Sequence, residues 1–216
     1  MDLAKRLIRE AKLGQGDLAK FQLYYHTKLY GNNPNIPNVE LTFEQAKMLF
    51  EYGKECGIEV FFSVFDTERV RWCEEIGVNR YKLASTRLTK ELFYAVVDTN
   101  KPIIQSLPFG RCEPDVLSWL HRPYKCVYLY CIPCYPTPLS DLHFEGIRWG
   151  KNDMYQGYSD HTIGLWAAKV ALARGAEIIE KHFSLSYNIG IDGKWSMTPE
   201  DLKELKRWES VCRQCL

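Results

Sequence analysis

Two lysines stand inside short apolar segments of the sequence, where a charged side chain is unusual. Lys20 lies in LAKFQLY and Lys82 lies in RYKLAS. An ammonium group inside an apolar strand is costly unless an anion compensates its charge. One such lysine alone is equally consistent with a side chain that reaches solvent at the strand rim. Two of them, with Ser85 and Ser106 at the ends of similar segments, favour a cradle for a phosphate or carboxylate group.

Two histidines occupy matching places at the ends of later apolar segments. His161 lies in YSDHT and His182 lies in EKHF. A lone histidine in such a place is more often a buried structural residue, but two imidazoles at the ends of successive strands can share one metal ion. The neighbouring Asp160 and Glu180 are then expected to orient the imidazoles. Imidazole with oxygen ligands suits manganese, iron, cobalt or zinc, so the sequence predicts a divalent metal site.

Helix-like segments alternate with short apolar segments along the chain, and this alternation predicts the fold class. Helices are expected at residues 2–13, 43–56, 66–76, 88–98, 113–120, 164–174 and 199–214. Strands are expected at residues 18–24, 58–64, 80–85, 101–106, 126–131, 154–159 and 176–183. Because the apolar segments are continuous, both faces of each strand should be covered, as in a parallel sheet of right-handed βα units. The sequence therefore predicts an α/β fold, a TIM-type (β/α)8 barrel that is incomplete because its first β-strand is missing.

The gap in the predicted barrel has consequences for its neighbours. A barrel that lacks one strand exposes unpaired backbone on the two strands beside the gap. We expect either that the protein begins upstream of Met1 or that another chain covers the seam, and a homodimer would hide such edges. The carboxyl ends of barrel strands carry the reactive groups. The polar residues there are Lys20, Gln22, Lys82, Ser85, Ser106, Tyr135, Ser159, Asp160, His161, Lys181 and His182.

Composition and charge limit the partners of the chain. A length of 216 residues with 46% hydrophobic content suffices for one core, so we expect a single domain over residues 1–216. The net charge is +1 with both signs spread along the chain, which favours neither nucleic acid nor an anionic membrane as partner. No apolar segment is long enough to span a bilayer, and MDLAKRLIREAK is a charged amphipathic start without a signal peptide. We therefore expect a cytoplasmic protein.

The eight cysteines raise the question of disulfides or a metal cluster. Most lie in apolar or helical segments of a chain large enough to fold without cross-links, so reduced thiols are expected. Two Cys-x-x-Cys pairs, Cys131/Cys134 and Cys212/Cys215, could together form a four-thiolate zinc or iron–sulfur site. Pro133 interrupts the first pair and the second lies at a helix terminus, so separate free cysteines are favoured.

Several segments resemble the N-acetylneuraminate (sialic acid) synthase family. The stretch GYSDHTIGLWAAKVALARGAEIIEKHFSL, followed by Asp192 and SMTPEDLKEL, is similar to the C-terminal part of that family's barrel. LAKFQ, FFSVFD, YKLAS and CIPCYPTPLSDL resemble other segments of the same barrel. The resemblance covers nearly the whole chain.

This resemblance implies a barrel enzyme that binds phosphoenolpyruvate and a manganese-type ion. The enol carbon would add to the open-chain aldehyde of N-acetylmannosamine or a related amino sugar, and water would release phosphate. By position, His161 and His182 would hold the metal, and Asp192 would face the sugar. The matched residues that would surround phosphoenolpyruvate are Lys20, Lys82, Ser85, Ser106, Tyr135 and Ser159.

The sequence departs from the family pattern at several places. It shows no counterpart of the Glu-Ile-Gly-x-Asn-His strand, which carries an acidic residue to the site, and no antifreeze-like domain. Arg87 stands where the family often has glutamate. The paired lysines and histidines favour an active synthase, while the departures favour a noncatalytic barrel that retains anion or metal binding as a partner subunit. An enzyme like 3-deoxy-octulosonate 8-phosphate synthase is a further alternative, and the acceptor sugar stays open.

Overall fold

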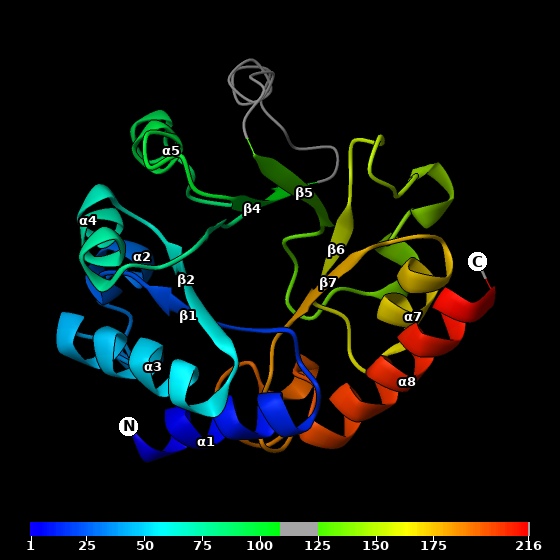
Figure 1. The fold of residues 1–216 in the computed structure, drawn as a ribbon, viewed down its shortest axis with the longest axis horizontal. Helices are drawn as coiled ribbons and strands as arrows, with labels where there is room; N and C mark the ends of the chain where they lie inside the picture. Colours follow the sequence, from blue (N-terminus) through cyan, green and yellow to red (C-terminus); the bar gives the residue numbers. More distant parts are fainter. Residues whose placement is uncertain (109–124, 216) are drawn as a thin grey trace.

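A single curled parallel sheet organises the residues that the computed structural model describes, 1–108 and 125–215. Its seven strands follow one another in chain order, so β1 and β7 are its two edges. The strands are β1 (Leu18–Leu23), β2 (Glu59–Val64), β3 (Tyr81–Leu83), β4 (Ile103–Pro108), β5 (Cys126–Cys131), β6 (Gly157–Asp160) and β7 (Ile178–Lys181). The sheet curls inside a ring of helices (Figure 1). This confirms the predicted barrel-type α/β fold with seven strands.

The helices lie on the outside of the curled sheet (Figure 1). They are α1 (Asp2–Leu13), α2 (His26–Tyr30), α3 (Phe43–Cys56), α4 (Thr67–Ile76), α5 (Lys90–Val97), α7 (Trp166–Ala173) and α8 (Pro199–Cys215). Single 3-10 turns occur at Leu139–Asp141, Phe144–Gly146 and Gly193–Trp195. The helix predicted at residues 113–120 lies outside the described residues. Within the described part of the chain, no helix has the length and apolar character needed to cross a membrane.

Helix α1 completes the outer ring between α3 and α8. It packs against both of these helices, although α8 is the last element of the chain. Lys206 of α8 forms an ion pair of 3.1 Å with Asp17, in the connection from α1 to β1. The ring of helices therefore closes between the first and last elements of the chain, next to the two edges of the sheet.

Local capping explains where the helices begin. Thr42 and Gln45 form a reciprocal capping box at the start of α3, as the sequence predicted. The side chains of Asp66 and Thr89 each accept a hydrogen bond from a backbone N–H in the first turn of the following helix. These two helices therefore begin later than predicted, because residues counted as helical are caps.

The main apolar core lies between the sheet and the helices, and it contains Leu23, Phe62 and Leu83 from the outer faces of the strands. A smaller cluster consists of Phe61, Ile104 and Leu129. Their side chains point to the opposite, inner face of the sheet, because successive residues of a strand point to opposite faces. Gly157 lies on this inner face, where an added Cβ would lie 2.2 Å from the carbonyl oxygen of Ile178. A side chain at position 157 would push β6 and β7 apart.

The described cysteines form no disulfide. They are Cys56, Cys73, Cys126, Cys131, Cys134, Cys212 and Cys215, and all are free. Cys131 is buried while Cys134 is exposed, so the two thiols of this Cys-x-x-Cys pair lie in different surroundings. Cys112 lies outside the described residues.

Candidate functional site

The inner face of the sheet changes from apolar to polar toward the carboxyl ends of the strands. The register pairs Ser63 with Lys82, and it pairs Ser159 with Glu180. Because side chains two positions apart share a face, Ser106 lies on the same side as Ile104, which is the strand partner of Lys82. The strands thus bring charged and hydroxyl side chains above the apolar cluster in the barrel interior.

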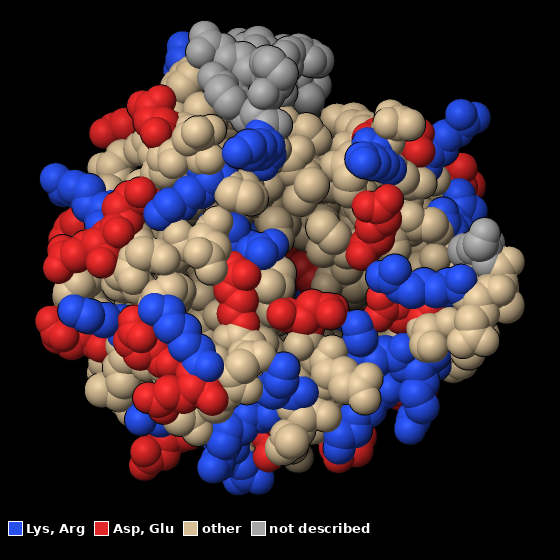
Figure 2. All heavy atoms as spheres, viewed as in Figure 1, with Lys and Arg blue, Asp and Glu red and all other residues tan. Residues whose placement is uncertain are grey.

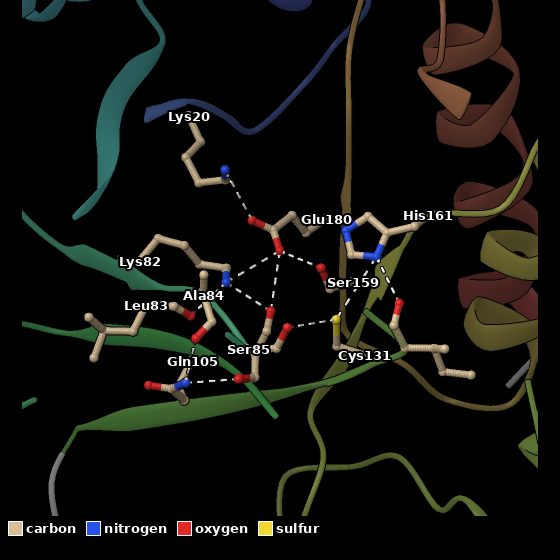
Figure 3. Close-up of polar contacts among 12 residues, drawn as sticks. Lys20, Lys82, Leu83, Ala84, Ser85, Gln105, Cys131, Ser159, His161 and Glu180 are labelled. Carbon is tan, nitrogen blue, oxygen red and sulfur yellow. Dashed lines mark hydrogen bonds and ion pairs between the residues drawn. The ribbon is translucent and has the colours of Figure 1, made fainter. Parts of the chain in front are cut away.

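The carboxylate of Glu180 lies at the centre of this polar layer (Figure 3). Its Oε2 accepts a hydrogen bond of 2.7 Å from the hydroxyl of Ser159, and Ser106 Oγ lies 3.5 Å from the same oxygen. The ammonium groups of Lys20 and Lys82 lie 3.4 Å and 3.5 Å from its two oxygens. Side chains from β1, β3, β4 and β6 therefore converge on one carboxylate of β7.

This arrangement corrects the expectation that Glu180 orients an imidazole. Its oxygens face two ammonium groups and two hydroxyls instead, because these donors occupy the inner face next to β7. Burial alone would raise the pKa of Glu180, but Lys82 and Lys20 together hold it far below its usual range. Glu180 is therefore ionised at neutral pH.

Lys82 is buried, and its ammonium group has a complete set of partners. The Nζ atom donates hydrogen bonds of 2.8 Å to the carbonyl oxygen of Leu83 and to Ser106 Oγ, and it faces Glu180. Burial lowers the pKa of Lys82, and the neighbouring Glu180 carboxylate opposes this effect. The charge of this buried lysine thus depends on an anion beside it.

His161 and His182 lie together beside the cradle, with ring centroids 5.6 Å apart. Nδ1 of His161 lies 3.2 Å from the carbonyl oxygen of Ile132, which can only accept, so this nitrogen carries the proton. Nδ1 of His182 lies 3.2 Å from Asp192 Oδ2. Burial, followed by the nearness of His182, lowers the pKa of His161 to about 4. The His161 ring is therefore neutral near pH 7, and its Nε2 carries the lone pair.

Asp160 has no direct contact with an imidazole either, because its oxygens have other partners. Its Oδ2 pairs at 2.8 Å with Lys181 in a fully buried ion pair. Its Oδ1 accepts hydrogen bonds of 2.8 Å from both the backbone N–H and the hydroxyl of Thr162. Lys181 also donates to the carbonyl oxygen of Thr162 at 2.7 Å. This network fixes the turn that carries His161, so Asp160 positions the imidazole through the backbone.

Tyr135 and Ser85 complete the set of predicted residues. The Tyr135 ring lies 4.2 Å from the His161 ring and 6.2 Å from the Trp195 ring, centroid to centroid. The thiol of Cys131 donates to Ser85 Oγ at 3.5 Å and lies 4.0 Å from His161 Nδ1. Cys131 thus links the serine to the histidine pair, which the sequence analysis missed although the residue ends a strand. Trp195 lies in a 3-10 turn and gives no periodic signal that could have revealed it.

The structure brings the nine residues that the family resemblance assigned to the site into one connected set of contacts. Lys20, Lys82, Ser106 and Ser159 meet at Glu180. The other contacts join Ser85, Tyr135, His161, His182 and Asp192. Cys131 connects the two groups, because it is the partner of Ser159 in the register of β5 and β6. Arg87, by contrast, donates a hydrogen bond to the carbonyl oxygen of Leu29 in α2 and is exposed.

The two imidazoles fit the ligand chemistry of a divalent metal ion. A metal-bound histidine commonly donates its other ring N–H to a backbone carbonyl or a carboxylate, and His161 and His182 show one case each. In the part of the chain that the structure describes, no cluster of three or more His, Cys, Asp or Glu side chains is arranged to hold a metal. The fit therefore rests on two protein nitrogens, and water or substrate oxygens would have to supply the other ligands.

The surface of the molecule has no single sign of charge on the face drawn in Figure 2. Lys and Arg are interspersed there with Asp and Glu, and the face has a hollow near its middle. The net charge of +1 agrees with this pattern. Attraction of an anion must therefore come from lysines inside the site and not from the field of the whole protein.

Comparison with known proteins gives the family of this barrel. The model of the NeuB family matches residues 7–214, and the chain belongs to this family. An uncharacterized protein of Methanocaldococcus jannaschii is 34% identical over 95% of the chain and 64% of its own length. The N,N'-diacetyllegionaminic acid synthase of Campylobacter jejuni is 30% identical over 95% of the chain and 70% of its own length. The chain thus spans about two thirds of the length of these relatives.

Solved structures agree with this assignment. The crystal structure of N-acetylneuraminic acid (sialic acid) synthetase from Leptospira borgpetersenii, in complex with citrate, superposes with a TM-score of 0.89 at 27% identity. The match covers 99% of the chain and 79% of that structure. The predicted resemblance to sialic acid synthases is confirmed. Two of these relatives are named as synthases of acidic sugars, N,N'-diacetyllegionaminic acid and N-acetylneuraminic acid.

Proposed function

We propose that this chain carries the barrel of a synthase that joins phosphoenolpyruvate to an amino sugar and releases inorganic phosphate. One observation carries the proposal: two lysines and two serines converge on the position of a carboxylate, beside a pair of imidazoles, in a member of the NeuB family. Phosphoenolpyruvate brings a phosphate and a carboxylate together, which is the chemistry such a set of donors recognises.

The cradle residues bind and orient the anionic substrate in this proposal. Lys20 and Lys82 neutralise its negative groups, and Ser85, Ser106 and Ser159 donate hydrogen bonds to its oxygens. Tyr135, whose ring lies against His161, would contact the substrate beside the histidines. Because Lys82 is buried, its charge acts in surroundings where water screens it weakly.

His161 and His182 would hold a divalent ion, for which we propose Mn²⁺. When bound, such an ion polarises a carbonyl oxygen, which activates an aldehyde toward attack by the enol carbon. Asp192 holds the His182 ring by its Nδ1 atom and, being partly exposed, also faces the acceptor sugar in this proposal. In the overall reaction, a carbon–carbon bond forms between the two substrates, water supplies an oxygen, and phosphate leaves.

The test is to incubate the protein with Mn²⁺, phosphoenolpyruvate and N-acetylmannosamine, and to follow phosphate release together with the mass of the product. Other N-acetylated amino sugars are compared, because the named relatives make different acidic sugars. We expect phosphate release that depends on the sugar and is lost in His161→Ala and His182→Ala. Lys169→Ala, which changes a lysine of the outer helix α7, is the matched control and should keep the activity.

A noncatalytic barrel is the second candidate. It is favoured by the finding that, among the described residues, no three potential ligands cluster around a metal position. In that case the protein would bind inorganic phosphate or Mn²⁺ but release no phosphate from phosphoenolpyruvate with any sugar. Binding without turnover would therefore replace the synthase proposal by this one.

A further inference from the structure

We propose that Glu180 is a built-in competitor of the anionic substrate, which binds the two site lysines when the site is empty and gives them up when an anion enters. The inference deepens the proposed function and rests on it for the identity of the substrate. From the sequence, Glu180 was expected to orient an imidazole instead.

Glu180 occupies the hydroxyl and ammonium donors that a bound anion would need. The carboxylate takes a hydrogen bond of 2.7 Å from Ser159 and lies within 3.5 Å of Ser106, and both lysines face it. A phosphate or carboxylate group that binds to Lys20 and Lys82 therefore has to share or replace these contacts. Glu180 thus occupies the place that an anion bound to these lysines would take.

The ammonium group of Lys82 already faces three partners. An ammonium group has three N–H bonds. Two of those of Lys82 form hydrogen bonds of 2.8 Å to the carbonyl oxygen of Leu83 and to Ser106 Oγ, and Glu180 Oε2 faces the ammonium group at 3.5 Å. Because the residue is buried, its ammonium group cannot turn to solvent for an additional partner. An incoming anion gains a donor from Lys82 most directly at the expense of Glu180, which is the longest of the three contacts.

The Glu180 carboxylate repels a second anion and has room to move away from the lysines. A second anion beside an ionised Glu180 is opposed by repulsion between like charges, which is strong where water is partly excluded. Glu180 lies on β7, an edge strand, and about a fifth of its side chain is exposed. The carboxylate can therefore withdraw from the lysines toward the opening of the site, whereas Lys82 cannot.

Two consequences follow for the enzyme. In the empty site Glu180 keeps the buried ammonium of Lys82 paired, which avoids the cost of an uncompensated buried charge. After the reaction, the returning carboxylate competes with inorganic phosphate for the same two lysines. Glu180 is thus expected to weaken the binding of phosphate and to speed its release.

The test is the affinity of the Glu180→Gln protein for inorganic phosphate, measured by calorimetric titration without any other substrate. Glutamine keeps the size of the side chain and an acceptor for Ser159 but removes the charge. We expect phosphate to bind at least about tenfold more tightly than to the unaltered protein. Glu177→Gln, which alters an exposed carboxylate just before β7, is the matched control and should leave the affinity unchanged.

Unchanged or weaker phosphate binding by folded Glu180→Gln overturns the proposal, because Glu180 then serves only to hold the lysines in place. If the variant does not fold, a crystal structure of the unaltered protein soaked with inorganic phosphate decides: the Glu180 carboxylate should have left Lys82. A carboxylate still in contact with both lysines beside bound phosphate contradicts the competition. The titration needs no turnover, so its result is independent of whether the protein releases phosphate from phosphoenolpyruvate.

Discussion

Lys20 on β1 and Glu180 on β7 form an ion pair of 3.4 Å that joins the two edge strands of the sheet. The pair spans the side on which the curled sheet is open. About a fifth of each side chain is exposed, so solvent weakens the attraction and its effect on stability should be small. Its importance lies in the site, because it places a β1 ammonium beside the buried Lys82.

Lys20→Met should weaken the binding of inorganic phosphate by about tenfold or more, because one of two cationic partners is lost. The free energy of unfolding should change by only about 1 kcal/mol, because the pair is partly exposed and Lys82 still neutralises Glu180. Calorimetric titration and urea unfolding measure the two quantities. Lys20→Arg keeps the charge and should restore most of the affinity. A large loss of stability with unchanged phosphate binding would show that the pair is structural.

Asp160→Asn should destabilise the fold by about 3–5 kcal/mol, because it leaves the ammonium of Lys181 buried without its counterion. Both side chains of this pair are fully buried. The measurement is the midpoint of urea unfolding followed by circular dichroism. Glu204→Gln, which removes the partner of Lys169 at the surface, should cost less than about 1 kcal/mol.

The same substitution tests the link between the buried pair and the histidine. The Asp160 network holds the turn through Thr162, so its loss should also reduce Mn²⁺ binding at His161 in the fraction that stays folded. Equal costs for Asp160→Asn and Glu204→Gln would mean that the pair does not anchor the turn.

Asp192→Ala should lower the affinity for Mn²⁺ by about 10-fold to 100-fold, the usual effect of removing a carboxylate that orients a metal-binding imidazole. The reason is the 3.2 Å contact between Asp192 Oδ2 and His182 Nδ1. Electron paramagnetic resonance of free Mn²⁺ measures the affinity without turnover. An unchanged Mn²⁺ affinity with a raised KM for the sugar would assign Asp192 to the acceptor alone.

The strand order and the site-bearing strands were predictable from sequence because they depend on local patterns. Continuous apolar segments gave the parallel strands, and Thr42 with Gln45 gave the start of α3. Lys82 was singled out because a charged side chain is unusual inside an apolar segment. The residues predicted at the carboxyl ends of the strands lie together in the structure, and their role as a site stays a prediction.

The partners of the charged groups were not predictable, because they depend on distances across the barrel. Glu180 lies two residues from His182, so sequence adjacency suggested a contact between them. In the folded chain, ammonium groups from β1 and β3 reach the carboxylate instead. The short helix α2 was missed because five residues are too few to show a helical period.

Thiol labelling of the native protein should modify Cys134 and Cys215 first and leave Cys73 unmodified. Cys134 and Cys215 are exposed, whereas Cys73 is buried and its burial raises its pKa to about 12. The thiolate is the reactive form, so at pH 8 only about one Cys73 in ten thousand would be reactive even if reagent reached it. Peptide mapping by mass spectrometry after a short pulse of iodoacetamide measures the order, with labelling in guanidinium as the control for complete reaction. Labelling of Cys73 at the rate of Cys134 would contradict the packing of α4 against the sheet.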